Sequence, residues 1–313
     1  MAGRIAVKTF IGFLLVVGCT SNDAGTGVPL IDGFAPPSPG DGEIQLVIPA
    51  IHGIAAGADT TQCTYLDYRA AKALDIISYH GYQSAIGAHH TILYAVATSQ
   101  AANTHECTED DMINARYVAG GGADSPEAPL PDGIVVRLPE NTQLMIQTHW
   151  INATDNIIDG QAAFNLKVED PKPTSVNSQL FTVTNTMMAL APGIATAHST
   201  CTVQQDMNFF MMGGHAHEWG THITLTETPA GQVPQVIYDT VWSKEYQFNP
   251  PRNSYTKDAP FTMHAGDTLA VDCTYNNTTG AMMYFPTEMC VSFGYFFPAV
   301  EEIDCTDGQW PTN

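Results

Sequence analysis

Short runs of β-branched and aromatic residues, separated by Gly, Pro, Asn and Asp, recur along most of the chain. The 313 residues include 26 Gly and 20 Pro, and helical periodicity is scarce, with a turn or two of helix expected only at Tyr68–Leu74. The predicted strands are Glu43–Pro49, His90–Ala97, Ile134–Leu138, Gln143–Ile151, Ala162–Val168, Leu180–Leu190, Asn208–Met212, His222–Thr226, Val233–Val241, Thr268–Tyr275 and Met289–Phe297. Many short strands at this spacing favour an antiparallel sandwich or jelly roll. We therefore predict an all-β fold of two antiparallel, jelly-roll-like β-sandwich domains packed side by side.

A Pro-containing segment divides the strand-rich region. Residues 169–173 read Glu-Asp-Pro-Lys-Pro, and Pro interrupts strand pairing. A boundary here gives two halves of ordinary domain size, residues 43–172 and 173–313. Residues 19–42 are rich in Gly, Pro and small polar residues, which predicts a flexible tether before the first domain.

Residues 1–18 have the features of an export signal. Arg4 and Lys8 precede an apolar run, Phe10–Val17, that is too short to span a bilayer as a helix. The end of this segment, Val16-Val17-Gly18-Cys19, resembles a bacterial lipobox, although Leu is commoner than Val at its first position. The alternative is a plain secretory signal with a chance cysteine. We expect cleavage after residue 18, lipid attachment at Cys19 and a bacterial cell-envelope location, anchored to the outer membrane on its periplasmic or surface face.

The charge of the chain limits its partners. Lys and Arg number 11 against 32 Asp and Glu, which gives a formal net charge of −21. Such a surface repels nucleic-acid phosphates and anionic membrane faces. We therefore expect no nucleic-acid partner, and membrane contact only through the lipid anchor. Metal cations are compatible with this charge.

Six cysteines follow Cys19, at positions 63, 107, 201, 273, 290 and 305. An even number in an exported protein suggests three disulfides, but six cysteines permit fifteen pairings. There is no Cys-x-x-Cys pair, which argues against a zinc ribbon.

Histidines are the most informative residues, and three groups stand out among the 11: His89-His90, His149, and His215-Ala216-His217. Residues two apart on a strand lie on one face, so His215 and His217 can bind the same ion. Adjacent His89 and His90 can do so only at a strand end or kink, or through different ring nitrogens. Met289 adds a thioether, and a thioether with two imidazoles favours copper, especially Cu(I), over zinc. Taken singly, each of these residues is more often structural.

The order and surroundings of these groups resemble the copper-dependent, ascorbate-using monooxygenases, a family that includes the peptidylglycine α-hydroxylating and dopamine β-hydroxylating enzymes. Ala88–Tyr94 looks like the family's His-His strand. Leu130–Ile134 and Leu144–Trp150 look like the segment of its third histidine. His215-Ala216-His217 and Glu288-Met289-Cys290 look like the two pieces of its second copper site. The resemblance covers roughly residues 43–305.

The resemblance implies two separated coppers per chain. His89, His90 and His149 would hold the electron-storage copper, and His215, His217 and Met289 the catalytic copper that binds O₂. Ascorbate or another one-electron reductant would load both, and one oxygen atom would become a hydroxyl on a substrate carbon. The partners would then be O₂ and a small-molecule substrate. The protein itself would be a monomer. The resemblance also implies the disulfides Cys63–Cys107, Cys201–Cys305 and Cys273–Cys290.

The resemblance further suggests what the substrate is not. The peptide-amidating members hold a substrate carboxylate with an Arg just before the His-x-His motif, and with an Asn and a Tyr after the Met-Cys pair. Those places here read Met212-Gly213-Gly214, Val291 and Phe293. A buried carboxylate without partners is costly, so we expect a neutral or cationic, largely apolar substrate contacted by Phe293 and Met212.

Two other functions fit parts of the sequence. A non-catalytic copper-binding or copper-storage lipoprotein would keep the metal ligands without turnover. A plain β-sandwich binding module would leave the ligand set as coincidence. Metal content separates the binding module from the two copper proteins. Reductant-dependent O₂ uptake then separates the monooxygenase from the copper-storage protein. His222, five residues after His217, would lie on the opposite face of an unbroken strand, and we interpret it as structural.

Overall fold

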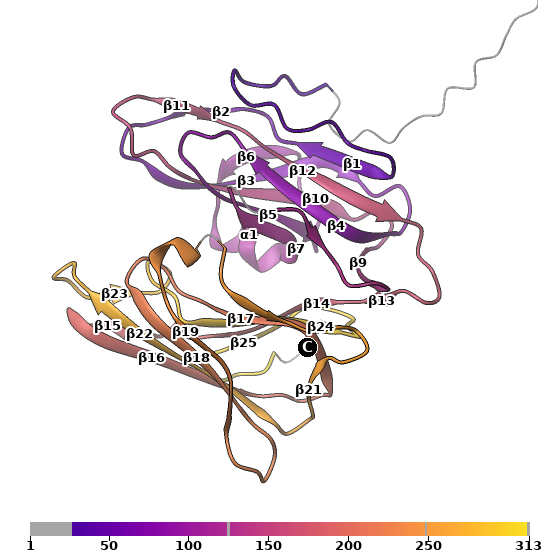
Figure 1. Cartoon of the computed structure of the whole chain (residues 1–313). Coiled ribbons are helices and arrows are strands. Elements are labelled where there is room, and N and C mark those ends of the chain that lie inside the picture. The colour runs from indigo at the N-terminus through magenta and orange to yellow at the C-terminus, as the bar shows by residue number, and fades with distance from the viewer. Residues whose placement is uncertain (1–26, 124–125, 248, 312–313) are drawn as a thin grey trace, which may run out of the picture.

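The computed structural model describes residues 27–123, 126–247 and 249–311. Cys19 and the export signal therefore lie outside the described residues. The chain forms two β-sandwich domains, one stacked on the other in Figure 1, which confirms the predicted all-β fold. None of the helices in these described ranges is long and apolar enough to cross a lipid bilayer.

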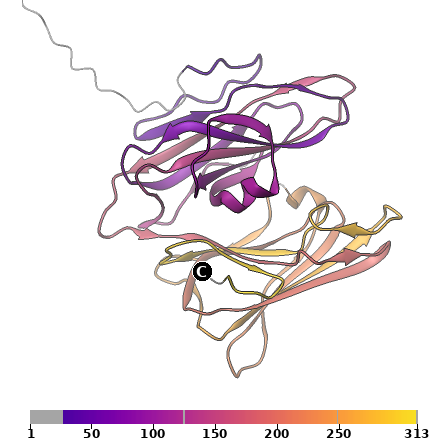
Figure 2. The same ribbon diagram turned by 180° about the vertical axis from the view of Figure 1, so that it is seen from behind.

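The first domain packs two sheets around a core of Ile, Leu, Val and Phe side chains. One sheet has the strand order β1 (Glu43–Val47), β12 (Ala162–Glu169), β4 (Leu74–Gln83), β9 (Ile134–Leu138) and β13 (Val176–Asn177), with β8 (Ala128–Pro129) beside β4. The other has the order β6 (Asn103–Glu106), β3 (Asp59–Arg69), β10 (Gln143–Ile151), β5 (Ala88–Val96) and β7 (Ala115–Gly122). A two-stranded ribbon joins β2 (Ile51–Ile54) to β11 (Ile158–Gly160). The short helix α1 (Glu109–Asn114) lies on the side of this domain that faces the second (Figures 1 and 2).

The second domain repeats the two-sheet plan around its own core. The sheet nearer the first domain has the order β20 (Arg252–Ser254), β17 (Met207–His215), β24 (Val291–Phe297), β14 (Gln179–Thr184) and β25 (Ile303–Thr306), with β21 (Phe261–Met263) beside β17. The other has the order β16 (Gly193–Thr202), β22 (Thr268–Asn277), β18 (Gly220–Thr228) and β19 (Gln235–Val241). A short ribbon pairs β15 (Ala189–Leu190) with β23 (Met283–Tyr284), and η1 (Lys244–Gln247) is a single 3-10 turn.

The domains meet through apolar and polar contacts. Ile134 of the first domain packs with Phe210, Tyr295 and Phe297 of the second. The main-chain N–H of Tyr117 on β7 donates to the Glu302 carboxylate at 2.7 Å. The two sandwiches thus share a small buried interface of their own.

The chain crosses between domains later than predicted. Strand β13 follows the Pro-rich joint but returns to the first domain, where it pairs in parallel with β9. The second domain starts at Gln179 on β14, after the buried Ser178. The proline pair therefore ends β12 without ending the first domain.

Residues 27–42 do not form the flexible tether that was predicted for 19–42. Phe34 is buried, with 5% of its surface exposed, against Val47 and Ala163. The carboxamide of Gln161 accepts the N–H of residue 31 and donates to the carbonyl of residue 29. Few apolar residues are needed to hold this segment because the first domain supplies the surface.

Two buried asparagines end equivalent strands in the two domains. Asn152 follows β10 and is fully buried, while Asn277 ends β22 and is 2% exposed. Each amide nitrogen donates to main-chain carbonyls, and each amide oxygen accepts the N–H and the O–H of the Thr two residues later. The same Asn-x-Thr turn therefore closes a strand in each sandwich.

The disulfides are Cys63–Cys107, Cys201–Cys305 and Cys273–Cys290. These are the pairs that the family resemblance implied. One lies in the first domain, and two link strands across the second.

Other elements differ from the sequence prediction. Residues 68–74 are not helical: β3 runs to Arg69 and β4 starts at Leu74. The single strand expected over Leu180–Leu190 is divided between β14 and β15. Among the longer elements, strands β3, β4, β7 and β16 and helix α1 were not predicted, and neither were most of the short strands.

Candidate metal centres

A β-bulge places His89 and His90 on the same side of β5. His149 on β10 pairs with His90, and the next residue, Trp150, pairs with Ala88. His89 is thus the extra residue, so two residues on β5 oppose one on β10. Adjacent residues of a regular strand point to opposite faces, and the bulge allows His89 and His90 to point to the same one.

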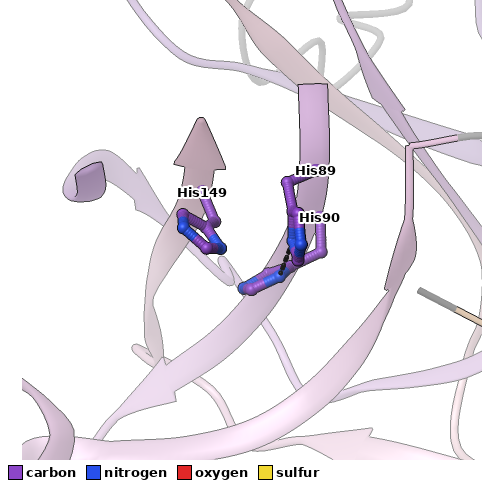
Figure 3. Close-up of side chains that lie close together, drawn as sticks. All are labelled: His89, His90 and His149. Atoms are coloured by element: carbon purple, nitrogen blue, oxygen red, sulfur yellow. Dashed lines mark hydrogen bonds between the residues drawn. The ribbon is translucent and has the colours of Figure 1, made fainter. Parts of the chain in front are cut away.

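Three imidazoles converge as a result (Figure 3). The ligand nitrogens of His89, His90 and His149 all lie within 4.8 Å of one another. The ring centroids of His89 and His149 are 4.3 Å apart, and the Nδ1 atoms of His89 and His90 are 3.0 Å apart. This first centre is preassembled by two adjacent strands of one sheet.

Neighbouring groups fix the orientation of His149. Its Nε2 lies 2.5 Å from the Asp59 carboxylate on the adjacent strand β3. An imidazole that donates one ring nitrogen to a carboxylate presents the other to a metal, so Nδ1 is the ligand atom that this arrangement favours. The Gln83 side chain donates to the His149 carbonyl at 3.3 Å.

The second pair of histidines lies at the end of β17. His215 is its last residue, and His217 follows in a turn, with ring centroids 5.0 Å apart. Between them, Ala216 is buried in the domain core. Nδ1 of His217 lies 3.1 Å from the Thr287 carbonyl, which favours Nε2 as its ligand atom.

Met289 belongs to the segment that contacts this turn. Its neighbour Glu288 is fully buried and accepts main-chain N–H groups from His217, Trp219 and Met289. Met289 itself is partly exposed, and its carbonyl accepts the Tyr275 hydroxyl at 2.6 Å. The structure thus brings the Met289 segment alongside His217, while the role of the thioether as a ligand stays a prediction.

Burial and mutual proximity favour the neutral form of three of the histidines. Burial, followed by the neighbouring imidazoles, lowers the pKa of His89, His90 and His215 to about 3. His215 and His217 contribute to the lowered pKa of His89, and His90 contributes to that of His215. The two groups of histidines therefore lie near each other across the domain interface, and His89, His90 and His215 are unprotonated at neutral pH.

The two predicted substrate contacts have different positions. Phe293 on β24 lies over Gly213, where an added Cβ would be 2.9 Å from its ring. Met212 does not face the first domain: it is 1% exposed in the core of the second, and its neighbour Met211 packs at the interface. A register shift between Phe209 and Met211 reverses which residues of β17 point inward, and this corrects the Met212 prediction.

A cation that was missing from the expected site comes from another strand. Arg252 on β20 pairs with Gly213, two residues before His215. Its charge lowers the pKa of Tyr79 and Tyr117, although burial dominates and raises both, so its guanidinium lies near the first domain. Arg252 thus brings a cation to the strand beside Gly213, while the charge of the substrate stays a prediction.

The remaining histidines have other contacts. His222 lies 3.1 Å from Asp239, which fits a structural role. His80 stacks on Tyr82. Four further histidines form pairs with aspartates: His52–Asp159, His105–Asp111, His198–Asp272 and His264–Asp206.

Comparison with known proteins assigns the second domain. Residues 178–312 match the family model of the copper type II ascorbate-dependent monooxygenase, C-terminal domain. The second domain is therefore assigned to this monooxygenase family. Members of the family depend on copper and ascorbate. No curated protein matches the chain.

Solved structures add little to the family assignment. One, described as the triple jelly roll fold and turret assembly in an archaeal virus, is 9% identical over 84% of this chain and 58% of its own, with a TM-score of 0.25. The atomic structure of Sulfolobus turreted icosahedral virus is also 9% identical, over 80% and 59%, with a TM-score of 0.23. The chain spans less than two thirds of either one, and such scores support no further argument.

Both candidate ligand sets fit copper. Three imidazole nitrogens within 4.8 Å are a donor set that copper accepts in both oxidation states. Two imidazoles beside a methionine segment form a softer set that favours Cu(I). Sequence reasoning selected the residues of both groups, which stay predicted ligands, but gave no role to Glu288 or Arg252. The Glu288-Met289 neighbourhood could have drawn attention to Glu288, whereas Arg252 depends on a strand pairing that no spacing reveals.

Proposed function

We propose that this protein is a copper-dependent monooxygenase that hydroxylates a C–H bond of a small organic substrate with O₂ and an external one-electron reductant. The family match supports the general activity but covers only residues 178–312. The observation that carries the proposal lies outside that match. His89, His90 and His149 converge in the first domain, where a two-centre enzyme needs its other metal site.

The chain's own residues would act in distinct ways. His89, His90 and His149 would hold one copper, and His215, His217 and Met289 the other. Bound copper would supply one-electron redox chemistry and O₂ activation. Asp59 would keep His149 oriented by accepting its Nε2–H. Phe293 would form one wall of the substrate site beside Gly213. Arg252 would pair with a polar or anionic group of the substrate.

Metal analysis tests the two-centre proposal. Wild-type protein should bind two coppers, and His89→Ala should bind one because it breaks only the first ligand set. His52→Ala is the matched control, since His52 pairs with Asp159 at the surface and should leave both coppers in place. One copper or none in well-folded wild type would contradict two centres.

Oxygen consumption separates an enzyme from a copper-storage protein. With reductant and a substrate, the wild type should consume O₂ in step with hydroxylated product, whereas His215→Ala should not. A panel of small amines, neutral compounds and carboxylates would identify the substrate charge, and Arg252→Gln should lower kcat/KM only for those with an anionic group. Full copper loading without reductant-dependent O₂ uptake for any compound would favour storage.

We also propose export and lipid anchoring at Cys19, which agrees with a chain that forms three disulfides. In a bacterial host, labelled palmitate should be incorporated into the wild type and not into Cys19→Ala. Equal labelling of both proteins would argue against the anchor.

A further inference from the structure

We propose that Glu288 is a positioning residue of the second metal centre, which fixes the main chain of His217 and of Met289 side by side. This inference rests on the proposed function, because it concerns ligands of that centre. Glu288 need not contact the metal, since it acts through the peptides of the two residues that would.

The contacts of Glu288 select these two ligand residues. One carboxylate oxygen accepts the N–H of His217 and, at 3.0 Å, the N–H of Met289. The other accepts the N–H of Trp219 at 3.1 Å, which closes the turn after His217. A single oxygen thus joins the ends of two segments that are distant in sequence.

The opposite side of each ligand peptide is also held. The His217 carbonyl accepts the Trp242 indole N–H at 3.0 Å, and the Met289 carbonyl accepts the Tyr275 hydroxyl at 2.6 Å. Gly220 leaves room for the indole ring of Trp242, since an added Cβ there would be 2.7 Å from the ring. Both ligand peptides are therefore fixed at the N–H by Glu288 and at the C=O by an aromatic side chain.

Burying the Glu288 carboxylate between two loops carries a desolvation cost. Glu288 is 0% exposed, and within the described part of the chain it forms no ion pair with Lys or Arg. An apolar side chain would avoid the desolvation cost of a charge but would leave three main-chain N–H groups unpaired. A carboxylate here pairs all three of these N–H groups, and a negative charge is also favourable beside a bound cation. The choice of Glu thus fits both the joining of the two segments and a metal centre beside them.

Copper binding by Glu288→Gln tests the proposal. Gln keeps the size of the side chain but removes the charge and places an NH₂ group where main-chain donors converge. We expect the Cu(I) affinity of the second centre to fall about tenfold or more, as for other residues that orient metal ligands. The sulfur signal of Met289 in X-ray absorption should also weaken. The first centre should bind as in the wild type and serves as an internal reference.

Glu227→Gln is the matched control. Glu227 is another buried carboxylate of the second domain, on β18, and among the described residues it forms no hydrogen bond or ion pair with the proposed metal ligands. Its loss should leave copper affinity and the sulfur signal unchanged. Glu288→Asp, which keeps the charge on a shorter side chain, should retain more Cu(I) affinity than Gln and provides a second variant if Gln impairs folding.

The outcomes separate this inference from the proposed function. If wild-type protein fails to bind a second copper, the proposed function fails irrespective of Glu288. If the wild type binds two coppers and Glu288→Gln binds them with equal affinity and an equal sulfur signal, only the positioning role fails. Equal losses in Glu288→Gln and Glu227→Gln would also overturn it, because they would indicate a general effect of removing a buried carboxylate.

Discussion

Asn152 illustrates how much one buried side chain supports the strand that carries His149. Its amide nitrogen donates to three main-chain carbonyls, and its amide oxygen accepts two hydrogen bonds from Thr154. Asn152→Ala should lower the free energy of unfolding by about 1–3 kcal/mol, because it leaves buried main-chain groups unpaired. Denaturant unfolding measures this, with the exposed Asn103→Ala as control. An Asn152→Ala effect no larger than that of the control would contradict the role.

Met289 should influence turnover more than folding. Met289→His keeps a donor atom but replaces a soft thioether with a harder imidazole, which disfavours Cu(I). We expect the variant to retain copper and to lose most of its activity, as measured by substrate-coupled O₂ uptake. Unchanged turnover would show that the thioether is not a ligand.

Residue spacing predicts contacts within one strand or turn and misses those made between strands. The spacing of His215 and His217 was enough to predict that their side chains lie close together. Met212 was misplaced because a bulge in β17 changes which residues face inward, and a bulge is not visible as a pattern. Arg252 was missed because it reaches Gly213 only through the pairing of β20 with β17.

Strand β13 is the element that ties the two domains together. Its Asn177 accepts the N–H of Arg137 in the first domain, and its amide nitrogen donates to the Ala299 carbonyl in the second at 2.9 Å. The Asn177 main chain pairs with Ala299 as well. Because side-chain bonds to both domains are lost, Asn177→Ala should speed limited proteolysis near residues 169–178 several-fold. Copper content should not change, and an unaltered cleavage rate would contradict this role.

Elements with strong β-branched or aromatic patterns were predicted well, and those built from small residues were not. Ile134–Leu138 and Gln143–Ile151 match β9 and β10 in both bounds. Strand β16 was missed because its inward positions are Ala197, Ser199 and Cys201, which give little hydrophobic contrast. Helix α1 was missed although Thr108 and Asp111 form a capping box, a signal that sequence can show.

At the scale of the whole molecule, Glu302 makes the contact between domains sensitive to pH. Burial raises the pKa of Glu302 to about 7, despite the hydrogen bond from the Tyr117 N–H. Between about pH 4.5 and pH 7, the Glu302 carboxyl is therefore protonated in the folded protein and ionised in the unfolded chain. The stability that this proton supplies is full below the unfolded pKa of 4.5 and is lost as pH rises through about 7.

Glu302→Gln should remove this dependence, since Gln resembles the protonated acid and its oxygen can still accept the Tyr117 N–H. The variant should be more stable than wild type at pH 8, with the difference shrinking towards pH 5. Denaturant unfolding at the two pH values measures it, and the exposed Glu140→Gln serves as control. A difference that is the same at both pH values would contradict the buried-acid interpretation.

The two Asn-x-Thr turns have a consequence for producing the protein. Both are acceptor sequences for N-linked oligosaccharide, which eukaryotic secretory cells attach to the amide nitrogen of Asn. That nitrogen is buried in Asn152 and Asn277 and is already committed to main-chain carbonyls. A sugar added to a nascent chain would have no room in the folded sandwich. Yeast or insect-cell secretion should thus give a mixture in which the glycosylated fraction is misfolded, and a host without this modification is the better choice.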